Sequence, residues 1–87
     1  MPYVYIVQCR DNTLYTGYTV DIDRRLEAHQ EGLASKYTRG RTPVNLVYCE
    51  DLPTKSDALR REMQIKKMSR TEKMLLIDKF AAKSFSE

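Results

Sequence analysis

Apolar and polar positions along the chain repeat with two different periods. A period of two, typical of strands, runs through three segments rich in β-branched and aromatic residues: 3–9, 13–19 and 44–50. A helical period of about 3.6 follows three residues that can cap a helix N-terminus. The predicted helices run from Asp21 to Gly32, from Thr54 to about Met68 and from Ser69 to about Phe80.

The first two strands are predicted to form a hairpin around the loop of residues 10–12. A three-residue loop with Asn12 in the left-handed conformation pairs Tyr5 with Gly17, and Val7 with Tyr15. Tyr5 and Tyr15 then share one face, and the missing side chain at Gly17 leaves room beside the Tyr5 ring. The opposite face carries the core residues Val4, Ile6 and Leu14.

The third strand should follow the same alternation. One face is predicted to hold Val44, Leu46 and Tyr48, and the other Asn45, Val47 and Cys49. Cys9 and Cys49 both lie in strand-like runs, so we expect reduced core thiols. A single histidine and the absence of Cys-x-x-Cys spacing argue against structural zinc.

The first predicted helix places polar side chains where it meets the body of the domain. Ile22 and Leu26 define its apolar side; Arg25 and His29 lie beside them, one turn apart, and Arg24 points away. Arg25 has two interpretations: a stem laid across the core edge with its head in water, or a functional cation. A permanent cation one turn away favours neutral His29, with one ring nitrogen free to accept a proton.

A carboxylate falls inside the apolar arc of the second predicted helix. That arc comprises Ala58, Leu59, Ile65 and Met68. Burying the charge of Glu62 costs several kcal/mol unless it is paired or binds a cation. Two alternatives follow: an ion pair with Lys66 one turn on, or a metal ligand.

Length and charge restrict the class of protein. Eighty-seven residues make one domain, 1–87, and a net charge of +3 suits a polyanionic partner. Cations and hydroxyls are interspersed in the loop of residues 33–41, a composition that suits phosphate contact but equally describes a solvated loop. We see neither a signal peptide nor an apolar run of membrane-spanning length, so we expect a cytoplasmic protein without membrane contact.

Several scattered residues together resemble the GIY-YIG nuclease family over residues 3–68. The residues that carry the resemblance are Tyr5, Tyr15-Thr16-Gly17, Arg25, His29 and Glu62. The first motif reads Tyr3-Val4-Tyr5, without its glycine, and residues 74–77 lack an asparagine that relatives often carry. The resemblance implies an α+β fold: a three-stranded antiparallel sheet flanked by helices in the order ββα-β-αα.

The resemblance also implies an endonuclease that hydrolyses phosphodiester bonds in DNA, such as branched or damaged DNA in repair or recombination. Glu62 would bind one divalent ion, Mg²⁺ or Mn²⁺, and Arg25 would clamp the scissile phosphate. Tyr15 is the candidate general base, with Tyr5 and His29 positioning or relaying the proton, although His29 could itself be the base.

Two further hypotheses stay open. The chain could be a non-catalytic nucleic-acid-binding module, or a nuclease subunit that requires a targeting protein partner. The candidate nucleic-acid contacts are Gly17, Lys36, Arg39, Arg41 and Lys67.

Overall fold

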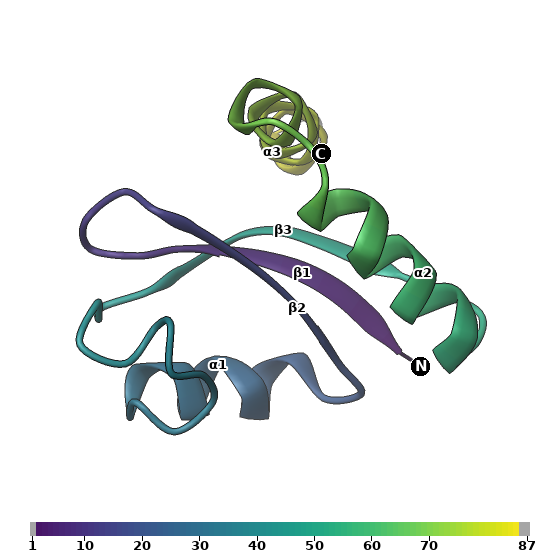
Figure 1. The fold of residues 1–87 in the computed structure, drawn as a ribbon. Helices are drawn as coiled ribbons and strands as arrows, with labels where there is room; N and C mark the ends of the chain where they lie inside the picture. The colour runs from purple at the N-terminus through teal and green to yellow at the C-terminus, as the bar shows by residue number, and fades with distance from the viewer. Residues whose placement is uncertain (1, 86–87) are drawn as a thin grey trace.

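The computed structural model describes residues 2–85 and confirms the predicted order of elements (Figure 1). The strands are β1 (Tyr3–Gln8), β2 (Leu14–Thr19) and β3 (Asn45–Asp51), and the helices are α1 (Ile22–Gln30), α2 (Lys55–Lys66) and α3 (Arg70–Phe85). Within the described residues the strands form one antiparallel sheet in the order β2-β1-β3.

The hairpin has the register expected from its loop. Tyr5 lies opposite Gly17, and Val7 opposite Tyr15. Asn12 has a φ of 68°, and the Cys9 N–H donates to the Thr13 carbonyl at 2.9 Å. This register directs Tyr5 and Tyr15 to the same face.

The two faces of the sheet carry separate hydrophobic cores. In Figure 1, α1 lies on one side of the sheet, and α2 and α3 lie on the other. Beneath α1 the buried residues are Tyr5, Val7, Cys9 and Val44, against which Ile22 and Leu26 pack. Beneath α2 and α3 they are Val4, Ile6, Ala58 and Ile65. Because both faces of β1 are covered, this central strand is buried through most of its length.

The third strand departs from strict alternation. Ile6 pairs with Tyr48, but Val7 pairs with Leu46, so Val47 is an extra residue in the ladder. The prediction that Val44, Leu46 and Tyr48 share one face is therefore wrong. A β-bulge reverses the direction of the following side chains, and Tyr48 joins Val47 against the core beneath α2 and α3.

The helix starts follow the predicted caps. The Asp21 carboxylate accepts a hydrogen bond from the Arg24 N–H, and the Thr54 hydroxyl accepts one from the Asp57 N–H, both at 3.1 Å. Ser69 and Glu72 form a reciprocal capping box before α3, with distances of 3.0 and 3.2 Å.

The helix ends agree only in part. Gly32 follows α1 with a φ of +77°, as its capping role requires. Helix α2 stops at Lys66, short of Met68, whose N–H donates to the Ile65 carbonyl in a tighter turn. Helix α3 continues past Phe80 to Phe85, since the intervening alanines favour helix. Leu59, predicted in the core, is 39% exposed.

Candidate active site

The site begins where the Tyr5 ring crosses β2 at Gly17. A Cβ atom at Gly17 would lie 2.5 Å from the Tyr5 hydroxyl oxygen and 2.7 Å from Cζ. Real Cβ contacts are not this short, so only glycine admits the ring at this place. The close approach expected at Gly17 is present, and the approaching group is the Tyr5 side chain.

The Tyr5 hydroxyl lies 2.8 Å from Nε2 of His29, which is fully buried. The other ring nitrogen, Nδ1, lies 2.9 Å from the hydroxyl oxygen of Thr38, also fully buried. The Thr38 hydroxyl is oriented to donate to the Ser35 carbonyl at 3.4 Å. We therefore assign the proton of neutral His29 to Nδ1, with Nε2 accepting from Tyr5.

This tautomer agrees with the electrostatic surroundings of the imidazole. Burial, and then the charge of Arg25, lower the pKa of His29 below its ordinary value. A neutral ring with both nitrogens hydrogen-bonded leaves no nitrogen for solvent. His29 therefore reaches a substrate only through the Tyr5 hydroxyl.

Tyr15 lies on the same face and is held by its ring. Its centroid is 5.4 Å from that of His29, edge-on at 66°, and 5.9 Å from that of Tyr37, stacked at 26°. Within the described part of the chain the Tyr15 hydroxyl makes no hydrogen bond. This half-buried phenol is thus available to a water molecule or a substrate.

Arg25 is half-buried, whereas Arg24 is exposed, as the helical spacing predicts. Among residues 2–85 the Arg25 guanidinium makes no hydrogen bond or ion pair, and Arg25 lines a surface hollow together with Asp21 and Arg24. A forked cation near the core edge and without a protein partner is suited to an anion.

Glu62 reaches the same region from the other layer. Its side chain is 18% exposed, and its carboxylate lies 3.6 Å from the Lys66 ammonium, beyond hydrogen-bond length. Helix α2 packs on β2 and β1, and the Glu62 charge is close enough to raise the pKa of the Tyr5 phenol. Both alternatives for Glu62 remain open, because this long ion pair leaves the carboxylate oxygens able to bind a cation.

The pKa of the Tyr5 phenol depends on its burial and on the charges of the neighbouring site residues. Burial raises its pKa well above the ordinary 10.0; Tyr15 raises it further, Arg25 acts in the opposite direction, and Glu62 adds to the rise. A hydroxyl in these surroundings keeps its proton and acts as a hydrogen-bond donor.

The carboxylate donor set fits a lightly coordinated divalent ion. Residues 2–85 contain no cluster of three or more His, Cys, Asp or Glu able to enclose a metal. Mg²⁺ and Mn²⁺ accept one or two carboxylates with phosphate oxygens and water in the other positions. Glu62 alone therefore suits an ion bound together with a phosphodiester, and does not suit a structural metal.

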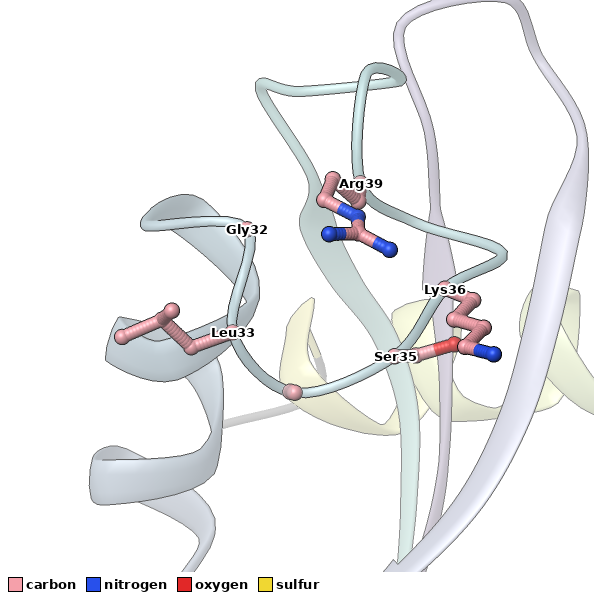
Figure 2. Close-up of a pocket in the computed structure, with 6 residues that line it drawn as sticks. Gly32, Leu33, Ser35, Lys36 and Arg39 are labelled. Atoms are coloured by element: carbon pink, nitrogen blue, oxygen red, sulfur yellow. The ribbon is translucent and has the colours of Figure 1, made fainter.

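The predicted basic contacts have different surroundings. Lys36 and Arg39 are exposed and project from the same loop, with Leu33 pointing away from both (Figure 2). Lys67 is exposed at the end of α2. Arg41 is engaged instead: its guanidinium donates to Asp11 at 3.1 Å and to the Tyr37 carbonyl at 2.7 Å.

Sequence reasoning missed the two residues of this loop that contact the site. Tyr37 stacks on Tyr15, and Thr38 accepts from His29. Figure 1 shows the connection between α1 and β3 folded back beside the C-terminal end of α1, which brings them there. A loop has no repeating pattern from which contacts with the site could be predicted. In the sequence, Tyr37 and Thr38 were therefore interpreted only as polar neighbours of the basic residues in this loop.

The fold is that of a GIY-YIG domain: a small antiparallel sheet with helices on both faces. The candidate site has the residue types of that class, namely two tyrosines, an arginine, a histidine and a glutamate. The family model described as the GIY-YIG catalytic domain matches residues 1–75. The chain belongs to the GIY-YIG family, a family of nucleases that bind nucleic acid and generally depend on a divalent metal.

Within that family the chain is similar to small proteins named UPF0213. The chain is 51% identical over 76 residues to a UPF0213 protein of Halobacterium salinarum, covering 87% of this chain and 99% of that one. It is 48% identical over 87 residues to one from Clostridium perfringens, covering 100% and 90%.

Solved structures show the same fold. The solution NMR structure of the UPF0213 protein BH0048 from Bacillus halodurans matches with a TM-score of 0.58 and 47% identity, over 90% of this chain and 84% of that one. The protein EF2693 from E. faecalis matches with a TM-score of 0.61 and 35% identity, over 92% and 85%. No helix in residues 2–85 has the length and apolar character to cross a membrane.

Proposed function

We propose that this protein is a divalent-metal-dependent endonuclease that hydrolyses phosphodiester bonds in DNA. The observation that carries the proposal is the convergence on Tyr5. Its hydroxyl is hydrogen-bonded to His29 and lies within electrostatic reach of Tyr15, Arg25 and Glu62. Hydrolysis needs a base for water, a cation for the phosphate and stabilisation of the leaving oxygen, and this group of residues offers a candidate for each.

Arg25 grips the scissile phosphate in this mechanism. Its charge is permanent, and its planar guanidinium can donate to two phosphate oxygens at once. Among the described residues it makes no ion pair that phosphate binding would have to break. Glu62 would hold the divalent ion, Mg²⁺ or Mn²⁺, which when bound would supply positive charge to stabilise the reacting phosphate.

Tyr15 is the accessible phenol, and as the phenolate it would take the proton of the attacking water and become the neutral hydroxyl. Tyr5 stays protonated and donates a hydrogen bond to Nε2 of His29. Its role is therefore to position the reacting groups, and not to act as the base. His29 supports both tyrosines from the buried side of the site. Its Nε2 accepts a hydrogen bond from the Tyr5 hydroxyl, and its ring contacts the Tyr15 ring in an edge-on arrangement.

Two variants with matched controls test the site. Arg25→Ala is compared with Arg60→Ala, at a 71% exposed side chain of α2, and Glu62→Gln with Glu72→Gln in the exposed first turn of α3. Branched, flapped, nicked and linear DNA are incubated with Mg²⁺, Mn²⁺ or EDTA. We expect the Arg25 and Glu62 variants to lose at least about 100-fold in kcat, as loss of a transition-state contact does. Parent-level cutting by both would show that the site is misassigned.

Tyr15→Phe tests the base, with Tyr18→Phe as its control on the opposite face. The Tyr15 variant should lose at least about 100-fold in kcat, the usual contribution of a general base, whereas the Tyr18 variant should cut like the parent. If Tyr15→Phe cuts normally, the base lies elsewhere.

The exposed cations Lys36 and Arg39 favour a second candidate, a nucleic-acid-binding module without catalysis. That function predicts binding that weakens with salt, is indifferent to EDTA, and leaves every DNA structure uncut. Cleavage restored only by a co-purifying protein would instead identify a subunit that needs a partner.

A further inference from the structure

Tyr37 contacts the proposed general base directly. Its ring stacks on Tyr15 with centroids 5.9 Å apart and an interplanar angle of 26°. Because the Tyr15 hydroxyl makes no hydrogen bond in the described part of the chain, its direction is set by packing on the core beneath α1 and by ring contacts. There are two in that part: the edge of His29 and the face of Tyr37.

The first of these contacts is fixed from inside the domain. His29 is fully buried and hydrogen-bonded through both ring nitrogens, so its ring has one orientation. Its edge restrains Tyr15 on one side only. The other side depends on a residue that is 39% exposed.

Tyr37 is held by polar contacts in place of burial. The Arg41 guanidinium lies 4.3 Å from the Tyr37 ring centroid and also donates to the Tyr37 carbonyl. Arg41 is in turn paired with Asp11 on the hairpin loop at 3.1 Å. The Tyr37 N–H donates to the Ser35 hydroxyl at 3.0 Å, which fixes the loop backbone.

We propose that Tyr37 is a positioning residue that aims the Tyr15 hydroxyl at the reacting water, with Asp11 and Arg41 holding Tyr37. The inference rests on the proposed function, in which Tyr15 is the base. A hydroxyl at the far end of a ring moves by about 1 Å for a modest rotation, and misplacements of that size lower rates strongly. Tyr37 therefore acts on the rate of chemistry through Tyr15, and not on substrate affinity.

Cleavage kinetics with three loop variants test this role. Tyr37→Leu should lower kcat about tenfold, which is about 1.4 kcal/mol, with KM within twofold. Tyr37→Phe keeps the ring and should restore kcat to within twofold of the parent. Leu33→Ala, at a 78% exposed residue of the same connection, is the control and should behave like the parent.

Asp11→Asn is a second variant that touches neither tyrosine. It replaces the oxygen that pairs with Arg41 by an amide N–H and keeps one oxygen to accept from the Thr13 hydroxyl, so the hairpin loop retains that contact, and it should lower kcat about threefold. NMR of tyrosine-labelled protein gives a readout besides activity. The Tyr15 ring signals should lose their ring-current shift in Tyr37→Leu and keep it in Tyr37→Phe.

The outcomes separate this inference from the function on which it rests. If the parent cuts and Tyr15→Phe does not, full kcat in Tyr37→Leu overturns the positioning role alone. A raised KM with unchanged kcat also overturns it, because Tyr37 would then contact substrate. Unchanged Tyr15 signals in Tyr37→Leu show that the stack does not form. A parent that cuts nothing overturns the function and the inference together.

Discussion

Replacing Gly17 by alanine adds one methyl group at the closest contact in the site. The new Cβ would lie 2.5 Å from the Tyr5 hydroxyl oxygen, 2.7 Å from Cζ and 2.9 Å from Cε2. Gly17 lies within β2, where alanine meets no backbone strain. The effect of the change is therefore steric and falls on one ring.

The cost follows from the lack of room around that ring. Tyr5 is 1% exposed and packed beneath α1, so it moves only by disturbing its neighbours, at about 1–3 kcal/mol for overpacking. Displacing its hydroxyl also breaks the hydrogen bond to His29, worth about 1 kcal/mol. We expect a loss of about 2–4 kcal/mol in the free energy of unfolding, and a fall in Tm of roughly 10–25 °C.

Urea denaturation of a double-mutant cycle measures this contact. In a Tyr5→Leu background the ring is absent, so Gly17→Ala should cost less by about 2 kcal/mol than in the parent. Gly40→Ala is the matched control: Gly40 has a φ of +85° and nothing within 4 Å of its added Cβ. Its cost comes from the backbone and should be equal in both backgrounds. An equal cost for Gly17→Ala in both would refute the steric explanation.

Two further predictions concern the buried histidine. Thr38→Val removes the acceptor of the His29 Nδ1–H and should cost about 1–3 kcal/mol in urea denaturation, because a buried donor is left unpaired; a near-neutral result would contradict the assigned tautomer. Burial and Arg25 lower the pKa of His29, so below pH 6.5 the unfolded chain binds the proton first and stability falls as pH drops. Urea titrations between pH 5 and 8 should show this loss in the parent and not in His29→Gln, and equal slopes would refute it.

Local rules were sufficient for the parts of the site that lie on regular elements. The loop length and Asn12 determine the register that places Tyr5 opposite Gly17. Helical spacing separates Arg25 from Arg24 in the same way. In each case the predicted contact depends on a short stretch with a fixed period.

The parts that were missed depend on contacts without a period. The bulge at Val47 leaves the alternation of residue types in β3 unchanged, so its sequence reads as a regular strand. Tyr37 and Thr38 reach the site because their loop folds back on α1, a tertiary arrangement that residue type does not encode locally.

Glu62 was identified by the free-energy cost of burying a charge. Periodicity alone shows only that a polar residue lies in the apolar arc of α2. An exposed ion pair is worth about 0–1 kcal/mol, and Lys66 is 53% exposed at 3.6 Å. That attraction does not offset the several kcal/mol that desolvating a carboxylate costs. The position is therefore poor for stability, and Glu62→Gln should unfold at no lower urea concentration than the parent. A variant that abolishes cleavage without loss of stability separates a chemical role for this carboxylate from a structural one.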